Sequence, residues 1–167
     1  ARIFLAPIIL VFLIFGNYLV CVLLFFLAGL TDYFDGYFAR KYNAVSELGE
    51  ILDPIADKIL VVFILIGLSV ELDSQLMALL SSLIIAREIG VAALRDYSAR
   101  NNLSERTKVT FLAKAKTSVQ LLTIGLYLLA LAISFNLLIL ISDILLIIAT
   151  FITVYTGYQY TLNVFKK

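Results

Sequence analysis

Two pairs of aspartates lie close together in the first third of the chain, and each pair adjoins strongly apolar sequence. Asp32 and Asp35 are three positions apart, whereas Asp53 and Asp57 are four positions apart. Because an α-helix advances about 100° per residue, each spacing places its two carboxylates on one helical face. The connection between the pairs, about 42–50, is short enough to make the two helices antiparallel neighbours. We therefore expect the four carboxylates to converge in one place.

Clustered carboxylates repel one another unless they are protonated or hold cations, and hard oxygen ligands suit Mg²⁺ or Mn²⁺. The sequence has no histidine, the commonest general base and transition-metal ligand, so acid–base chemistry would fall to carboxylates or lysines. Salt bridges from the aspartates to Arg40 or Lys58 are the alternative. They would not explain the small residues Gly36 and Ala39 that follow Asp35.

The same stretch resembles the signature of the CDP-alcohol phosphotransferases, D-x2-D-G-x2-A-R-x8-G-x3-D-x3-D. All eight defined positions match, and at about one in twenty per position a chance match is negligible. The matching residues are Asp32, Asp35, Gly36, Ala39, Arg40, Gly49, Asp53 and Asp57.

The resemblance implies a role for each aspartate. Asp32, Asp35 and Asp53 would ligate metal that grips the diphosphate of a CDP-linked donor. Asp57 would be the general base on the incoming alcohol and would also touch a second metal, so we expect two ions, Mg²⁺ or Mn²⁺. Metal would neutralise the diphosphate and make CMP a better leaving group, while a carboxylate deprotonates the attacking hydroxyl.

The remaining signature residues would contact the donor. Gly36 and Ala39 let a phosphate or ribose approach the backbone, although alone they are typical of helix packing in a membrane. Arg40 would bind a donor phosphate, or else it is one of the basic residues typical of a cytoplasmic face. Gly49 and Asp32 complete the donor-binding set that we expect.

A second group of charged residues lies inside apolar sequence nearer the C-terminus. Arg87 and Arg95 are eight positions apart, roughly on one helical face, and Glu88 adjoins the first of them. Lys114 and Lys116 lie early in the next apolar segment. Ionisable groups within membrane spans are costly, so we expect an anionic ligand or a local partner such as Glu88. The lysines could instead extend to the headgroup region.

Here the resemblance narrows to bacterial phosphatidylglycerophosphate synthases. It is carried by A-R-E at 86–88, L-R at 94–95 and K-A-K-T at 114–117. It implies a homodimer that transfers a phosphatidyl group from CDP-diacylglycerol to sn-glycerol 3-phosphate, giving phosphatidylglycerophosphate and CMP. The acceptor phosphate would be held by Arg87, Arg95, Lys114 and Lys116.

Three other functions stay open at this point. The first keeps the chemistry and changes the acceptor to phosphatidylglycerol, serine or an inositol compound, although serine carries no phosphate for the basic group to bind. The second is an ion-coupled transporter. The clustering of the charges at one membrane face argues against this function. The third is a structural scaffold in the membrane, which would tolerate Asp35→Asn.

Composition indicates a membrane protein. The 167 residues are 62% hydrophobic, with a mean hydropathy of +1.03, whereas soluble domains are about half apolar. A net charge of +1 argues against a nucleic-acid partner, and the single Cys21 allows no intrachain disulfide. We expect one domain, 1–167, with a truncated N-terminus, because the chain begins near the family's Arg-x4-Pro element, Arg2 to Pro7.

Six apolar segments predict an all-α integral membrane protein with six transmembrane helices. The turns near 16, 72 and 135 contain no Lys or Arg, so the positive-inside rule places both termini in the cytoplasm. The metal site would then lie at the cytoplasmic ends of helices 2 and 3 of a bacterial-type inner (cytoplasmic) membrane, with the active site facing the cytoplasm. The expected segments are 3–15, 18–42, 51–70, 75–97, 109–133 and 137–164.

Two further features concern the last segment. We expect Tyr155, Tyr158, Tyr160 and Phe165 to form an aromatic belt at the membrane interface. Asp143 lies at the opposite end of that segment, far from the predicted site, and we assign it no role.

Overall fold

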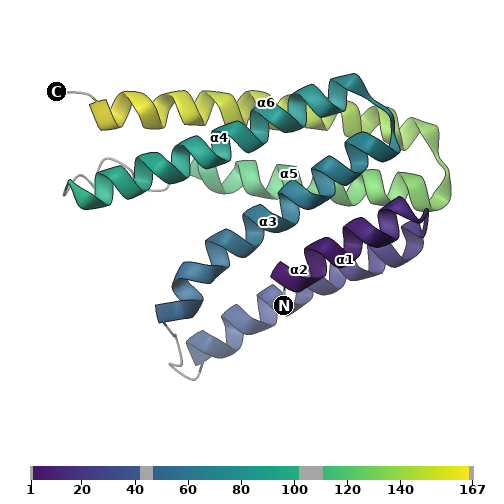
Figure 1. Ribbon diagram of the computed structural model, residues 1–167, viewed down its shortest axis with the longest axis horizontal. Coiled ribbons are helices and arrows are strands. Elements are labelled where there is room, and N and C mark those ends of the chain that lie inside the picture. The colour runs from purple at the N-terminus through teal and green to yellow at the C-terminus, as the bar shows by residue number, and fades with distance from the viewer. Residues whose placement is uncertain (1, 42–46, 102–110, 166–167) are drawn as a thin grey trace.

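The computed structural model describes residues 2–41, 47–101 and 111–165 (Figure 1). Each predicted apolar segment corresponds to a helix, and most boundaries agree within about three residues. The largest difference is at α3, which begins at 47, four residues before the predicted 51. The helices are α1 (Arg2–Ile14), α2 (Tyr18–Lys41), α3 (Glu47–Glu71), α4 (Gln75–Arg100), α5 (Phe111–Ile133) and α6 (Asn136–Phe165).

Three short turns join the helices at one end of the bundle, and each contains a residue with positive φ. These are Gly16 (71°), Asp73 (43°) and Ser134 (53°). At the first turn, the amides of Gly16 and Asn17 donate to carbonyls of the last turn of α1, at 3.0 and 2.9 Å. A left-handed residue therefore caps each of these helices and reverses the chain. The turns predicted at these three places are confirmed.

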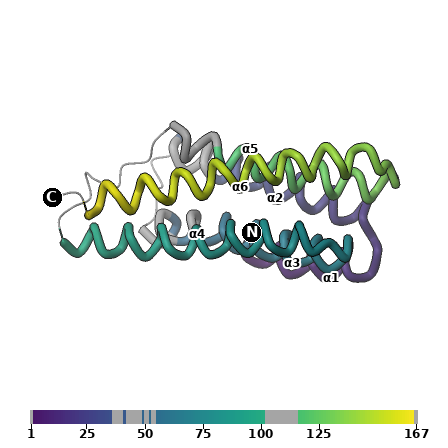
Figure 2. The backbone as a smooth tube through the Cα atoms, turned by 90° about the horizontal axis from the view of Figure 1, so that it is seen from above, coloured from purple at the N-terminus to yellow at the C-terminus, as the bar shows by residue number. Residues whose placement is uncertain are grey.

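The six helices form two layers, with α2, α5 and α6 in one and α1, α3 and α4 in the other (Figure 2). Packing runs round a ring in the order α1, α2, α5, α6, α4, α3, and α3 also packs on α5. The prediction that helices 2 and 3 are direct neighbours is wrong within the described residues, because α1 packs against both and the two do not pack on each other. The first helix therefore mediates their contact.

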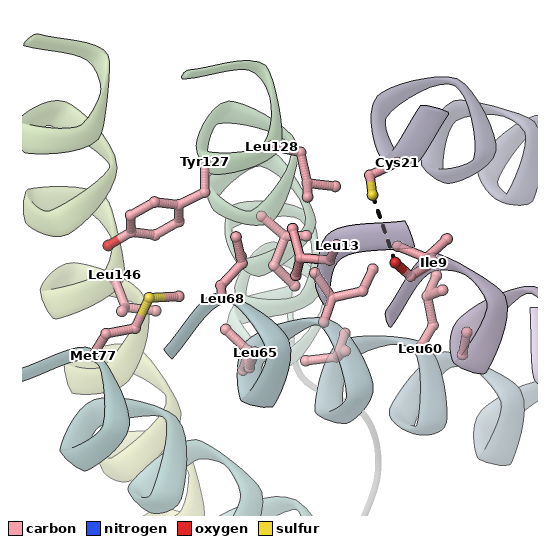
Figure 3. Close-up of a cluster of buried hydrophobic side chains, with 14 of the residues drawn as sticks. Ile9, Leu13, Cys21, Leu60, Leu65, Leu68, Met77, Tyr127, Leu128 and Leu146 are labelled. Atoms are coloured by element: carbon pink, nitrogen blue, oxygen red, sulfur yellow. Dashed lines mark hydrogen bonds between the residues drawn. The ribbon is translucent and has the colours of Figure 1, made fainter. Parts of the chain in front are cut away.

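The bundle core is apolar and draws on all six helices (Figure 3). Ile9 and Leu13 of α1 and Leu65 of α3 belong to this core, and Tyr127 of α5 is fully buried in it on the side of Leu146 and Met77. The Cys21 thiol donates to the Ile9 carbonyl at 3.5 Å. At the same end of the molecule, the Tyr127 hydroxyl donates to Asp143 Oδ1 at 2.5 Å. This contact gives Asp143 a structural partner.

The outward faces of the helices are also apolar. Phe4, Val70 and Phe151 are mostly exposed, whereas Gln120 and Thr123 are buried between helices. A soluble protein rarely exposes so much large apolar surface, and lipid is the solvent that favours it. Within the described part of the chain, four stretches are long and apolar enough to cross a membrane, namely Tyr18–Asp35, Gln75–Arg100, Lys116–Ile133 and Asn136–Phe165. The fold is that of an all-helical membrane protein.

Candidate active site

A buried arginine on α1 lies at the centre of the predicted acidic site. Arg2 donates through Nη1 to Asp57 Oδ1 on α3 and pairs through Nη2 with Asp32 Oδ1 on α2. Its side chain is 8% exposed, whereas the two carboxylates are 46% and 45% exposed. Arg2 thus brings together acids from two helices that do not pack on each other. We call Arg2, Asp32 and Asp57 the acidic cluster.

The structure brings two of the four aspartates, Asp32 and Asp57, to one side chain, that of Arg2. Asp35 lies one turn beyond Asp32 on α2 and is exposed, and the described part of Asp53 does not include its side chain. The side chains of Ala39 and Arg40 also fall outside the described part of the chain. Gly49, in the first turn of α3, is partly buried.

The carboxylates of the acidic cluster are the expected ligands of a divalent cation. Within the described residues no three acidic or sulfur ligands are grouped closely enough for a metal ion. Asp32 and Asp57 nevertheless converge on one cationic group, the Arg2 guanidinium. Their half-exposed carboxylate oxygens are of the kind that Mg²⁺ and Mn²⁺ prefer. The ligand type therefore suits such an ion, and the described residues supply two of the carboxylates of such a site.

A cavity of about 280 Å³ opens beside the acidic cluster. Arg2, Asp32 and Asp57 form its polar end, and the rest of its wall is almost entirely apolar. The cavity therefore fits an amphiphilic ligand with a charged head and a hydrocarbon tail. The remaining lining residues, from α2, α3 and α5, are Phe25, Phe26, Gly29, Leu30, Leu60 and Leu121.

Glu88 of α4 is the centre of the second predicted group. It accepts hydrogen bonds from Arg87 Nη1 at 3.0 Å and from Lys116 Nζ of α5. The Glu88 side chain is 14% exposed, and both cationic side chains are buried at least as deeply. Lys58, next to Asp57, is close enough to interact electrostatically with Glu88, so the two groups are close in space. We call Arg87, Glu88, Arg95 and Lys116 the basic cluster.

Helix α6 supplies partners that sequence reasoning missed. Arg87 Nη2 donates to Thr156 Oγ1 at 2.8 Å, and Arg95 Nη2 donates to the Tyr160 hydroxyl at 3.2 Å. The Tyr160 ring centroid lies 6.0 Å from the Arg87 guanidinium carbon and 5.3 Å from that of Arg95. A signal was present in the sequence: Thr153, Thr156 and Tyr160 recur at helical spacing in the last segment.

This contact corrects the predicted aromatic belt. Tyr160 is only 3% exposed and faces the bundle interior, because its ring and hydroxyl receive the two arginines of α4. Tyr155, Tyr158 and Phe165 are exposed, as residues of a belt would be. Only those three still fit the interfacial assignment.

The basic cluster keeps unused donor capacity. Arg87 Nε and Arg95 Nε are buried and have no hydrogen-bond partner among the described residues. Glu88 is the local partner that the sequence had offered as an alternative to an anionic ligand, and it engages Arg87 and Lys116. The described part of this cluster contains three cationic side chains and one carboxylate, which pairs with two of them. The side chain of Lys114 lies beyond what the structure describes.

Comparison with known proteins decides the family. The family model for CDP-alcohol phosphatidyltransferases matches residues 1–155. The chain belongs to this family. A CDP-diacylglycerol–glycerol-3-phosphate 3-phosphatidyltransferase from Rickettsia bellii is 44% identical over 139 residues, 83% of this chain and 75% of that protein.

Two further relatives carry the same name. The one from Rickettsia felis is 39% identical over 164 residues, covering 96% of this chain and 88% of that protein. The one from Blochmanniella floridana is 41% identical over 111 residues, covering 66% of this chain and 58% of that protein.

Membership of the CDP-alcohol phosphatidyltransferases makes the protein an enzyme of the transferase class. The family is generally dependent on a divalent metal, and carboxylates such as Asp32 and Asp57 are ligands of the type that such an ion prefers. The family resemblance read from the spacing of the aspartates is confirmed, and neither a transporter nor a scaffold is needed to explain the charged residues.

Proposed function

We propose that the protein transfers the phosphatidyl group of CDP-diacylglycerol to the hydroxyl of sn-glycerol 3-phosphate, giving phosphatidylglycerophosphate and CMP. The observation that carries this proposal is the pairing of two oppositely charged clusters. The acidic cluster adjoins an amphiphilic cavity that suits a lipid-linked donor. The basic cluster has buried guanidinium N–H groups left over for an acceptor phosphate. The names of the relatives support the same two substrates.

The donor occupies the cavity with its diphosphate at the acidic end. Asp32, Asp35, Asp53 and Asp57 hold Mg²⁺ or Mn²⁺, as two ions. When bound, the metal neutralises the negative charge of the diphosphate. The acyl chains lie along the apolar wall toward Phe25 and continue into the bilayer. The donor's nucleotide and phosphates are contacted by Asp32, Gly36, Ala39, Arg40 and Gly49.

Asp57 acts as the general base. Its carboxylate is half exposed, so an acceptor hydroxyl can reach it, and Arg2 fixes its orientation from the buried side. Asp57 accepts the hydroxyl proton while the hydroxyl oxygen forms a bond to the phosphorus that carries diacylglycerol. The bond from that phosphorus to the bridging oxygen breaks, and CMP leaves with the electron pair.

The basic cluster binds the acceptor's phosphate. Arg87, Arg95, Lys114 and Lys116 supply positive charge in a partly desolvated position, where charge-assisted hydrogen bonds are strongest. Serine carries no phosphate and would leave these donors unpaired, so the cluster favours glycerol 3-phosphate among the candidate acceptors.

The proposed membrane arrangement rests on the distribution of basic residues along the sequence. Six spans with both termini in the cytoplasm place the acidic cluster at the cytoplasmic ends of α2 and α3, in a bacterial-type inner membrane. There the water-soluble acceptor enters and CMP leaves. A homodimer is part of the proposal through the family resemblance.

The acceptor is tested by product formation. Purified protein in detergent receives CDP-diacylglycerol and Mg²⁺, and candidate alcohols are added one at a time. We expect CMP and a new phosphate-bearing lipid with glycerol 3-phosphate, and neither product from a folded Asp57→Asn variant. CMP release with a different alcohol, and none with glycerol 3-phosphate, would overturn the acceptor assignment while leaving the donor chemistry in place.

The donor site is tested by filling the cavity. A Cβ at Gly29 meets nothing within 4 Å, so Gly29→Ala should behave as wild type. Gly29→Leu places a large side chain in the cavity, and we expect the KM for CDP-diacylglycerol to rise about tenfold or more. The KM for glycerol 3-phosphate should not change. Equal KM values for CDP-diacylglycerol in the two variants would remove the cavity from the donor site.

A further inference from the structure

A stripe of small and polar residues runs along the buried face of α6. Thr153, Thr156, Gly157 and Tyr160 occupy positions that follow the helical repeat and lie on one face. All four are buried, although the rest of α6 is largely apolar and much of its surface is exposed. Buried hydroxyls in a membrane helix are costly unless they are hydrogen-bonded. The partners of these side chains therefore indicate why they are present.

Gly157 makes room for the side chain of Arg87. A Cβ built on Gly157 would lie 2.8 Å from Arg87 Cγ, 3.2 Å from Nε and 3.6 Å from Cδ. The aliphatic part of Arg87 therefore lies across the bare backbone of α6. Any larger residue at 157 would force Arg87 into another rotamer.

Gly90 provides a natural comparison with Gly157. Both glycines line the same groove between α4 and α6, which has a volume of about 380 Å³. A Cβ on Gly90 meets nothing within 4 Å, so an added methyl group is accommodated there. The groove itself therefore tolerates a methyl group at one glycine and not at the other.

Thr156 fixes the direction in which the Arg87 guanidinium points. Its hydroxyl has one proton, which it can donate to the Ile152 carbonyl at 2.8 Å or to the Thr153 carbonyl at 3.0 Å. Toward Arg87 Nη2 the same oxygen can then act only as an acceptor. Glu88 accepts a hydrogen bond from Nη1 of Arg87, and Thr156 accepts one from Nη2. Each terminal nitrogen of the guanidinium therefore has one N–H engaged.

Tyr160 holds the second arginine relative to the first. Its hydroxyl accepts from Arg95, and both guanidinium groups approach the same ring. A ring face attracts cations, so it lets two positive groups lie near each other inside the bundle at lower cost. The two arginines, eight residues apart on α4, therefore contact the same tyrosine of α6.

We propose that α6 positions the anion-binding arginines of α4. Gly157 admits Arg87, Thr156 orients it, and Tyr160 fixes Arg95, so that both guanidinium groups are held in place for binding a phosphate monoester. Gly157, Thr156 and Tyr160 are positioning residues that act through the arginines. This inference rests on the proposed function, in which the anion is the phosphate of the acceptor.

The first test compares two glycine variants in detergent. We expect Gly157→Ala to raise the KM for glycerol 3-phosphate about tenfold or more, with little change in kcat or in the KM for CDP-diacylglycerol. Gly90→Ala should match wild type in all three. A Gly157→Ala enzyme with a wild-type acceptor KM overturns the inference. So does an equal rise in both KM values, because that is the effect of a merely structural glycine.

The second test uses the hydroxyl of Thr156. Thr156→Val keeps the shape and loses the acceptor oxygen, so the acceptor KM should rise, whereas Thr156→Ser should restore it toward wild type. Equal acceptor KM values for the Val and Ser variants would contradict the orienting role of this hydroxyl.

A binding measurement separates this inference from the proposed reaction. Inorganic phosphate, the probe, should raise the unfolding temperature of the wild-type protein and of Gly90→Ala. The rise should be smaller for Gly157→Ala. An equal rise in the three proteins, or none in wild type, would overturn the inference. Failure of the proposed function would show differently, because wild type would then make no lipid product from glycerol 3-phosphate.

Discussion

Arg2 and Glu88 occupy corresponding positions in two clusters of opposite sign. In the acidic cluster, one buried guanidinium is shared by two carboxylates from different helices. In the basic cluster, one buried carboxylate is shared by the cationic side chains of Arg87 and Lys116. Each cluster therefore places a single opposite charge at its centre, where it reduces repulsion among the groups around it.

The clusters differ in how far their outer groups are exposed. Asp32 and Asp57 are nearly half exposed, so hydrated cations and a soluble leaving group can reach them. Arg87 and Lys116 are buried, so their interactions are little screened and any unpaired charge there is costly. Losing the central charge should therefore cost more stability in the basic cluster than in the acidic one.

The largest loss in the free energy of unfolding is expected on substitution of Glu88. Glu88→Gln removes the carboxylate and leaves Arg87 and Lys116 buried without it. Breaking a buried ion pair by removing one partner costs roughly 3–5 kcal/mol, and we expect a loss of that order in the free energy of unfolding. Denaturant unfolding in detergent measures it.

A second substitution checks the cause of that loss. Adding Lys116→Met to Glu88→Gln removes one of the two stranded charges, so the double variant should regain part of the lost stability. A double variant no more stable than the single one would show that the carboxylate does not act as the counter-charge of Lys116.

A smaller loss in the free energy of unfolding, which depends on whether divalent metal is present, is expected on substitution of Arg2. Arg2→Met keeps an unbranched apolar stem, shorter than that of arginine, and removes the charge between Asp32 and Asp57. We expect a loss of about 1.5–3 kcal/mol in the free energy of unfolding without divalent metal, the range for hydrogen bonds to charged groups. Mg²⁺ or Mn²⁺ should restore much of it, because the two carboxylates can share the ion.

The effect of metal on the stability of Arg2→Met distinguishes two roles for Arg2. Unfolding is measured with each ion and with a chelator, for Arg2→Met and for wild type. A loss of the same size under both conditions would mean that Arg2 only packs α1 in place and that the carboxylates do not accept a metal together.

The smallest effect is expected at an exposed pair outside both clusters. Asp96 and Arg100, one turn apart on α4, form a salt bridge at 2.9 Å with both side chains exposed. Asp96→Asn should change the free energy of unfolding by less than about 1 kcal/mol, because exposed pairs are weak and screened. A loss as large as that of Glu88→Gln would contradict burial as the reason for the difference between the clusters.

The acidic cluster was largely predictable because its signal is local. The spacing of Asp32, Asp35, Asp53 and Asp57 along two helices indicated a shared face, and the residue types indicated a cation. The role of Arg2 was not predictable. It depends on α1 packing against both α2 and α3, which no periodicity in the sequence specifies.

The basic cluster was only half predictable, because its partners are far apart in sequence. The charges at Arg87, Arg95 and Lys116 were conspicuous in apolar segments, and Glu88 was considered as a partner. Tyr160, 65 residues beyond Arg95, was assigned to the membrane interface from its type and position. Its burial follows from the packing of α6 on α4, which depends on the whole fold.

The helices themselves were predictable because apolar runs and turn residues mark them directly. Gly16 and Ser134 end α1 and α5 in left-handed conformations at predicted turns. The order of helices round the bundle was not predictable, since every helix has an apolar outer face and the hydrophobic pattern does not show which side is inside.

The central proposal is that the acidic cluster binds the donor and the basic cluster binds the acceptor. The most direct test is the steady-state kinetics of Arg95→Met, measured with the concentrations of both substrates varied. Removing one charge-assisted contact should raise the KM for glycerol 3-phosphate roughly ten- to a hundredfold. The KM for CDP-diacylglycerol should stay at its wild-type value. An unchanged acceptor KM, or a rise confined to CDP-diacylglycerol, would contradict the assignment of the basic cluster to the acceptor phosphate.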